Sequence, residues 1–413
     1  MKFENISLTN QPINETSYNK PDALLILRGI ACLMVVVTHC SPARNAIISQ
    51  NHDISWLTFS NGLVAVWIFF CLSGYLMGKA FYTKRYTADT KGVIKFWFNR
   101  AVRICPLYYF AVFICTLFVY PSILQIDNWG YIIRLITFTY QPYMYSRGVS
   151  FNGALWSIST EMQFYLIVPF VYVLFSKVIS NRKRAFVAII SIIFTVALIK
   201  LGIYLSFYSQ ITEHLQYAFT YWYAPLLTNL DVFLCGFLIN PLIHYSKQST
   251  KPNWKIIAVI LLIILYLFTA HHLYNQELWG LPGRDVKGFR TSTTIFILQP
   301  LTALVTCIFI YAFEHKVYNL YTQNLKLTFA AILKNPVRAL EIPGILSYGI
   351  YIWHMPIINR VGANFSSNIP IEQFYSTLIA TIILSSILAT LTYYLIEIRG
   401  AKLKTIILAP LHQ

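Results

Sequence analysis

The sequence predicts an all-α, polytopic integral membrane protein with about ten transmembrane helices and both termini in the cytoplasm. Of its 413 residues, 57% are hydrophobic and only 11% are charged, which excludes both an ordinary soluble globule and a disordered chain. Its apolar runs are numerous, and most are long enough to cross a bilayer as helices. Lys and Arg show an about threefold excess in the connections expected on the inner side, and this bias sets the orientation.

The expected elements follow one another with short connections and no soluble domain. Residues 1–22 are a polar cytoplasmic tail without a cleavable signal pattern, residues 23–397 form the membrane domain, and residues 398–413 form a second cytoplasmic tail. The outer connection 125–153 contains WGYIIRLITFTYQPY, which predicts a short interfacial or re-entrant helix. The predicted spans are residues 23–40, 61–82, 104–124, 154–176, 185–205, 223–243, 254–272, 293–313, 343–361 and 375–397.

The net charge of +17 is interpreted as a topology signal, because the basic residues are spread over all the inner segments. We therefore expect no nucleic-acid binding. Seven cysteines lie in or beside apolar runs without a CxxC pair, and they are expected to pack as small hydrophobic residues. We expect no metal site.

Ionisable residues inside a membrane are costly, so each one suggests function. The run RGIACLMVVVTHC places Arg28 and His39 eleven positions apart, which puts them on nearly the same helix face and about 16 Å apart along the axis. Arg28 then lies near the cytoplasm and His39 lies deeper. The alternative is a snorkelling arginine with an interfacial histidine.

Two further blocks lie on the cytoplasmic side. In FWFNRAVRICPLYYF, Arg100 and Arg103 are three residues apart on one side of a helix, an arrangement that suits phosphate binding or plain positive-inside anchoring. In FFCLSGYLMG, Ser73 and Gly74 lie in the cytoplasmic half of a span, and Gly74 begins a GxxxG that permits close approach of a ligand or another helix.

Two deeper blocks carry polar side chains. ALWSISTEMQFYLIVP places Ser157 and Glu161 on one face, and LSYGIYIWHMP places Tyr351 and His354 on a polar stripe. For Glu161 and His354 the alternatives are a hydrogen-bonded carboxylate and a packing histidine. Asp231 is the other acidic residue well inside a span, and Lys200 is expected to snorkel.

The placements make two layers, with arginines toward the cytoplasm and acid–base groups deeper. An anionic donor with phosphates at one end and a long thin arm ending in a reactive group would fit both layers, and acyl-coenzyme A has that shape.

These blocks resemble the motifs of acyltransferase family 3, membrane acyltransferases that commonly O-acetylate cell-surface glycans. RGIACLMVVVTH resembles the family's arginine, ten residues, histidine motif, and NRAVRICPLYY resembles its R-x-x-R motif. LSGYLMG, LWSISTEMQFYLIVP and LSYGIYIWH resemble further blocks in the same order, so the similarity covers residues 24–397. The chain departs at Glu397-Ile-Arg-Gly, where the family often has Glu-x-Pro.

The resemblance implies a bacterial inner-membrane enzyme, embedded in the lipid bilayer, that transfers an acyl group, most commonly acetyl, from cytoplasmic acyl-CoA to a hydroxyl of a glycan or lipid-linked glycan. Many relatives carry an additional extracytoplasmic hydrolase-like domain, and because we see none in this sequence we expect a stand-alone form. On this hypothesis His39 is a general base or transient acyl carrier, and Glu161 either orients His39 or stabilises its imidazolium. The donor's phosphates are expected to be bound by Arg28, Arg100 and Arg103. The donor channel is expected to be lined by Ser73, Gly74 and Tyr75. The acceptor is expected to lie near Ser157, Tyr351 and His354.

The alternative from another class is a transporter or flippase of glycan or lipid-linked precursors. It would use Glu161, Asp231 and the histidines as proton-coupled or polar groups in the membrane.

Overall fold

A computed structural model describes residues 21–142, 151–245, 253–279, 293–315, 327–365 and 367–400. These residues are almost entirely helical and confirm the all-α prediction. The long helices are α1 (Ala23–His39), α2 (Gly62–Tyr82), α3 (Thr90–Ile114), α5 (Leu155–Val178), α6 (Arg182–Ser206), α9 (Leu226–His244), α10 (Trp254–Tyr274), α12 (Gln299–Glu314), α14 (Glu341–Val361) and α15 (Pro370–Thr392). The short elements are α4 (Trp129–Ile136), α7 (Tyr208–Glu213), α8 (Leu215–Ala218), α11 (Gln276–Trp279), α13 (Phe329–Lys334), β1 (Ile48–Ser49) and β2 (His52–Asp53).

The membrane-spanning architecture agrees with the predicted spans. Within the described residues, eight helices are long and apolar enough to cross a membrane, and they coincide with eight of the ten predictions. The other two predicted spans are the helices α1 and α14. The predicted span 104–124 differs at its start, because the stretch that carries Arg100 and Arg103 is already helical from Thr90. The chain is therefore a multi-pass membrane protein. The tails 1–22 and 398–413 lie mostly outside the described residues.

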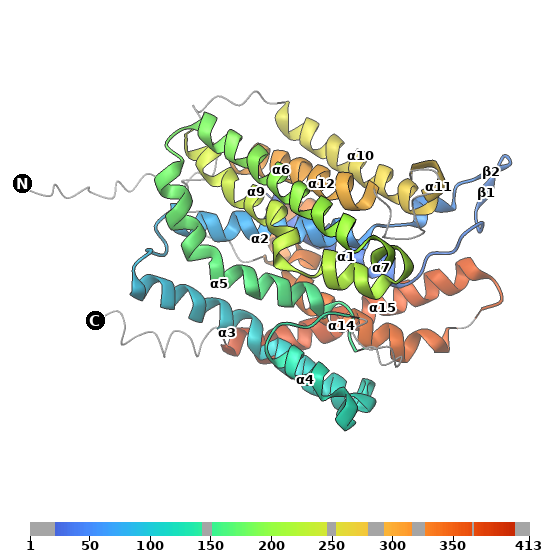
Figure 1. Cartoon of the computed structure of the whole chain (residues 1–413). Helices are drawn as coiled ribbons and strands as arrows, with labels where there is room; N and C mark the ends of the chain where they lie inside the picture. The colour runs from blue at the N-terminus through green and yellow to red at the C-terminus, as the bar shows by residue number, and fades with distance from the viewer. Residues whose placement is uncertain are drawn as a thin grey trace, which may run out of the picture.

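The end of α1 and the end of α10 lie at the same end of the bundle, as alternating crossings require. The Arg44 guanidinium, in the connection after α1, donates to the carbonyl oxygens of Tyr274 and Leu273 at 2.7 and 3.1 Å. The antiparallel pair β1–β2, which the sequence did not predict, lies at this end together with α11 (Figure 1). The short helix α4 occupies the predicted outer connection 125–153.

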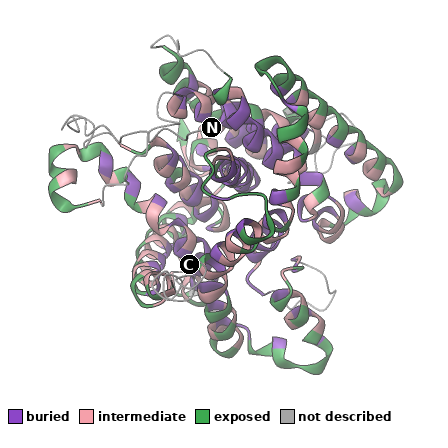
Figure 2. Ribbon diagram, turned by 90° about the vertical axis from the view of Figure 1, so that its left-hand side faces the viewer, coloured by how far each residue is buried: buried purple, intermediate pink, exposed green. Residues whose placement is uncertain are grey.

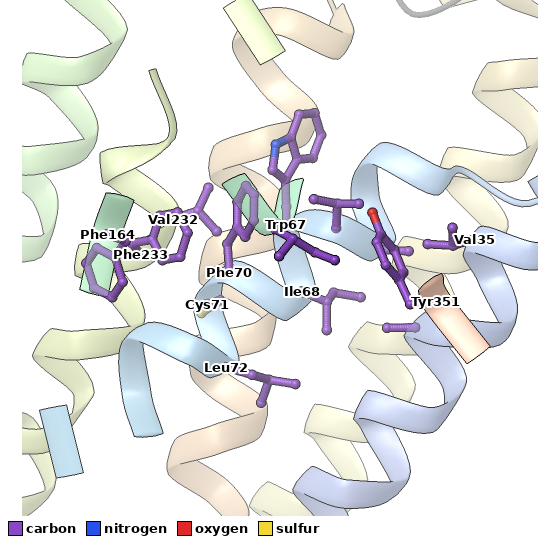
Figure 3. Packing of buried hydrophobic residues seen from close by; sticks show 14 of the residues in the cluster. Val35, Trp67, Ile68, Phe70, Cys71, Leu72, Phe164, Val232, Phe233 and Tyr351 are labelled. Carbon is purple, nitrogen blue, oxygen red and sulfur yellow. The ribbon is translucent and has the colours of Figure 1, made fainter. Parts of the chain in front are cut away.

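The core lies between the helices, and apolar side chains also cover the outside. Figure 2 shows buried residues gathered toward the middle and exposed ones on the outer helices. On α6, Phe186, Phe194 and Leu205 are 58%, 62% and 71% exposed, which fits a lipid-facing surface because lipid does not penalise apolar exposure. Inside, the rings of Phe70 and Phe164 stack on either side of Phe233 at 4.3 and 4.2 Å, joining α2, α5 and α9 (Figure 3).

Glycines allow two pairs of helices to approach closely. A methyl group added at Gly74 would lie 1.9 Å from the carbonyl oxygen of Phe233, and one at Gly236 would lie 2.0 Å from that of Cys71, so α2 and α9 touch backbone to backbone. A methyl group at Gly344 would likewise lie 2.0 Å from the carbonyl oxygen of Leu25, which brings α14 against α1. Small residues at such contacts are the usual means of packing helices tightly in a membrane.

Helices α1 and α14 run parallel in one fixed register. Gly29 packs against the backbone of Gly344, Cys32 Sγ donates to the Ser347 carbonyl oxygen at 3.4 Å, and His39 bonds His354, each pair being 315 positions apart. At the start of the pair, the Asp22 N–H donates to Glu341 Oε1 at 3.1 Å. Each residue of α1 therefore lies at the same height as the residue of α14 that is 315 positions later in the chain.

Candidate active site

A cavity of about 880 Å³ lies between α1, α2, α3, α5 and α14. That volume is in the range of small-molecule and cofactor sites. Five basic side chains line it against three acidic ones, so its charge is positive overall: Arg28, Lys79, Arg85, Arg100 and Arg103 against Asp22, Glu161 and Glu314.

The three predicted arginines meet at this cavity. Arg28 comes from α1, and Arg100 and Arg103 come from α3. The Nε atoms of Arg28 and Arg100 are buried and have no hydrogen-bond partner among the described residues. The Arg100 guanidinium carbon also lies 6.0 Å from the centre of the Tyr165 ring. A buried N–H donor without an acceptor is costly, so the two arginines are suited to an anionic ligand.

Glu161 lies on α5 in the wall of the cavity, between two hydroxyl groups. Ser73 Oγ and Tyr165 Oη both donate to Glu161 Oε1, and the two hydroxyls are themselves 3.0 Å apart. Glu161 was expected to orient His39, but the residue that bonds His39 is His354. The reason is helix rotation: the face of α5 that carries Glu161 and Tyr165 is turned toward Ser73 on α2.

Ser157 and Tyr351 line the same cavity at its deeper end. The two hydroxyls are 2.6 Å apart, and the Tyr351 hydroxyl also donates to the Ala154 carbonyl oxygen at 3.1 Å. In the register of α1 and α14, Tyr351 lies eight residues beyond the level of Arg28, which is about 12 Å along the axis. The cavity therefore runs from the arginines toward the level of His39.

The two histidines lie just beyond that end, in contact with each other. His39 Nδ1 is 2.9 Å from His354 Nε2, and His354 Nδ1 is 2.7 Å from the Tyr351 carbonyl oxygen. His354 is fully buried and His39 is half-buried. Neither lines the cavity itself, but Tyr351 contacts both the cavity and His354. The structure thus places His354 beside His39, a pairing that the sequence did not predict.

Two residues expected in the donor channel lie outside the cavity lining. Gly74 faces α9, where its missing side chain lets the helices touch. The Tyr75 hydroxyl donates to Glu314 Oε2 at 2.6 Å, and Lys79 pairs with the same oxygen at 2.6 Å. Of the FFCLSGYLMG block, Ser73 is the residue that reaches the cavity with its hydroxyl.

The sequence did not indicate several of the residues that line the cavity. Tyr165 could have been found, since it lies one turn after Glu161 on the same face. Lys79, Arg85 and Glu314 gave no signal, because charged residues at the ends of spans are ordinary anchors. Asp22, which caps α1 by accepting the Leu25 N–H at 3.0 Å, also lines the cavity, and desolvation raises the pKa of its carboxyl group.

The other intramembrane charges form a separate pair. Lys200 on α6 was expected to snorkel, but it is only 2% exposed and its Nζ lies 3.8 Å from Asp231 Oδ2 on α9. Gln299 Nε2 donates to Asp231 Oδ1 at 2.8 Å. Among the described residues, no group of three or more His, Cys, Asp or Glu side chains is arranged to hold a metal ion.

Comparisons with known proteins agree with the motif resemblance. Residues 22–390 match the family model described as "Acyltransferase domain". A Staphylococcus aureus (strain COL) protein named "Putative O-acetyltransferase" is 26% identical over 402 residues, covering 90% of this chain and 56% of the relative. "O-acetyltransferase OatA" of Staphylococcus aureus (strain NCTC 8325 / PS 47) is 25% identical over 374 residues, covering 85% of this chain and 54% of the relative. The chain thus spans about half the length of these relatives. No solved structure matches it.

Proposed function

Because the chain belongs to the acyltransferase domain family, we propose that it is a membrane-bound O-acyltransferase. In this proposal the enzyme transfers an acetyl group from cytoplasmic acetyl-CoA to a hydroxyl of a cell-surface glycan or lipid-linked glycan. The relatives named as O-acetyltransferases support the reaction class. The corresponding location is the bacterial inner membrane.

One observation carries the proposal: a single cavity runs from three arginines to Tyr351, whose carbonyl oxygen bonds one histidine of the pair. Two of the arginines present buried Nε–H groups without a partner among the described residues. Phosphate oxygens would satisfy these donors, and charge-assisted bonds of this kind are the strong ones. The narrow part of the donor would then extend past Ser73 and Glu161 toward Ser157 and Tyr351.

In the proposed reaction His39 handles the proton. Its Nδ1 is bonded to His354, so Nε2 is the nitrogen left for the substrate. His39 Nε2 accepts the proton of the acceptor hydroxyl while the oxygen attacks the thioester carbon. The carbon–oxygen bond forms, the carbon–sulfur bond breaks, and His39 returns the proton to the departing thiolate. A base placed in this way typically contributes ~10²–10⁴-fold.

A second route uses the same nitrogen as a nucleophile that carries the acyl group before the acceptor takes it. A labelled, hydroxylamine-sensitive adduct on His39 after rapid quenching supports this relay. Absence of the adduct at every quench time, with turnover intact, supports direct transfer.

The test is transfer of label from radioactive acetyl-CoA in membranes that contain the full chain. Wild-type membranes should label a glycan or lipid-linked glycan fraction, and His39→Ala should reduce the rate by about 10²-fold or more. Arg184→Gln is the control for an Arg100→Gln variant of the cavity, because Arg184 is exposed on α6 and lies outside the cavity. Near wild-type turnover in His39→Ala overturns the role of His39.

The acceptor is identified by glycan mass analysis of a strain with and without the gene, where a mass shift of one acyl group names both acyl chain and acceptor. The comparisons do not favour the transporter alternative. Movement of a glycan across the membrane without consumption of an acyl donor would decide for it.

A further inference from the structure

The two histidines form a hydrogen-bonded chain whose direction is set by a backbone carbonyl. The Tyr351 carbonyl oxygen, 2.7 Å from His354 Nδ1, can only accept, so His354 Nδ1 carries a proton. A neutral imidazole has one N–H and one lone pair, so His354 Nε2 presents its lone pair. That lone pair faces His39 Nδ1 at 2.9 Å.

The chain therefore determines the protonation of His39. Its Nδ1 must donate to His354, since two facing lone pairs in a buried site would repel and leave both nitrogens without a partner. In the neutral ring this leaves Nε2 unprotonated, which is the form that a general base or a nucleophile needs.

The surroundings hold this arrangement in place. The Val35 carbonyl oxygen, one turn before His39, also accepts from the His39 ring, whereas the Thr38 hydroxyl is engaged with the carbonyl oxygens of Met34 and Ser60 at 2.9 and 2.8 Å. The close contact of Gly29 with Gly344 and the bond from Cys32 to Ser347 fix the level of α1 against α14. Because His39 and His354 each lie ten residues after Gly29 and Gly344, the same register brings the two histidines into contact.

We propose that His354 is a positioning residue that holds His39 in the tautomer with an unprotonated Nε2. His354 also shares the extra proton during turnover. When His39 Nε2 takes the acceptor proton, the Nδ1 proton can shift to His354 Nε2 across the 2.9 Å bond, and it shifts back when the thiolate is protonated. The catalytic consequence rests on the proposed function, whereas the tautomer is a property of the pair alone.

The tautomer is tested without any acyl donor by carbethoxylation with diethyl pyrocarbonate, which reacts with unprotonated imidazole nitrogen. Purified full-length protein is labelled briefly, and the modified peptides are quantified by mass spectrometry. His354→Phe removes the acceptor and keeps an aromatic ring, while His354→Gln keeps an amide oxygen as acceptor. Exposed His52 is the internal reference for reagent and folding.

We expect His39 to be modified about fivefold to tenfold more slowly in His354→Phe, as loss of one hydrogen bond implies. His354→Gln should label near the wild-type rate, with His52 unchanged in both variants. Equal rates at His39 in wild type and His354→Phe would overturn the proposal. If His354→Phe does not fold, the Gln variant still decides, because a loss of His39 labelling there contradicts the acceptor role.

Kinetics give the second readout. His354→Phe should lower kcat for acetyl transfer by about 10²-fold while KM for acetyl-CoA stays within about twofold, because the arginines are untouched. His354→Gln should recover part of kcat. Unchanged kcat overturns the catalytic consequence. If the wild type transfers no acetyl group, the proposed function fails, and the labelling experiment still decides the tautomer.

Discussion

From the close contact between α1 and α14 we predict how far the two helices must separate when Gly344 is replaced by alanine. In Gly344→Ala the new methyl carbon would lie 2.0 Å from the Leu25 carbonyl oxygen, whereas ordinary contact begins at 3.4 Å. The two backbones must therefore separate by about 1.4 Å, the difference of these two distances. Backbone atoms cannot rotate away as a side chain can, so α14 has to move as a unit.

The same displacement acts on the histidine pair ten residues along. A 2.9 Å hydrogen bond lengthened by that amount is no longer a hydrogen bond. We expect acetyl transfer to fall by about 10²-fold, the usual effect of a misplacement of about 1 Å at a reacting group. Overpacking at the contact should also lower the free energy of unfolding by about 1–3 kcal/mol.

The assay combines label transfer from acetyl-CoA in membranes with thermal unfolding of the protein in detergent. Gly29→Ala is the graded variant, since its methyl group would lie 2.8 Å from the Gly344 nitrogen and demands a smaller shift. Gly202→Ala on α6 is the matched control, because nothing lies within 4 Å of its added methyl group. Acetyl-transfer activity should be highest in Gly202→Ala, lower in Gly29→Ala and lowest in Gly344→Ala. Wild-type turnover in Gly344→Ala would refute the coupling between this contact and the site.

Three further outcomes follow from the described contacts. Arg100→Gln should raise KM for acetyl-CoA by about 10-fold to 100-fold with a smaller change in kcat, as expected for a charged donor to phosphate; an unchanged KM in steady-state kinetics argues against phosphate binding. Lys200→Met should destabilise the protein by about 3–5 kcal/mol by leaving Asp231 buried without its ion partner, and Lys200→Met with Asp231→Asn should recover most of that loss in thermal unfolding. Hydrogen bonds from Ser55 and Tyr274 lower the pKa of the Asp53 carboxyl group below 3.8. These hydrogen bonds stabilise the β1–β2 connection at neutral pH, and this stabilisation is lost as the pH falls through the lowered pKa of Asp53. Tyr274→Phe removes one of the bonds, so on acidification protease cleavage within residues 44–60 should begin at a higher pH than in the wild type. An unchanged pH of onset contradicts the hydrogen bond from Tyr274 to Asp53.

The sequence by itself determined the membrane architecture. Long apolar runs must form helices in a bilayer, since only intrahelical bonds satisfy the backbone there. Helical periodicity also determined which residues of one helix share a face, as for Arg28 with His39 and Arg100 with Arg103. These are local properties, and packing of the helices then brought the three arginines to one cavity and left His39 just beyond its end.

Only the tertiary structure decided which faces meet. His39 contacts His354 and not Glu161, Lys200 contacts Asp231, and Gly74 serves the contact with α9. Periodicity gives the direction of a side chain around its own axis but not the rotation, height or neighbour of that helix in the bundle. Those are set by close packing of small residues far apart in the chain. The contact of Gly29 with Gly344 does this for the histidine pair, across 315 positions of sequence.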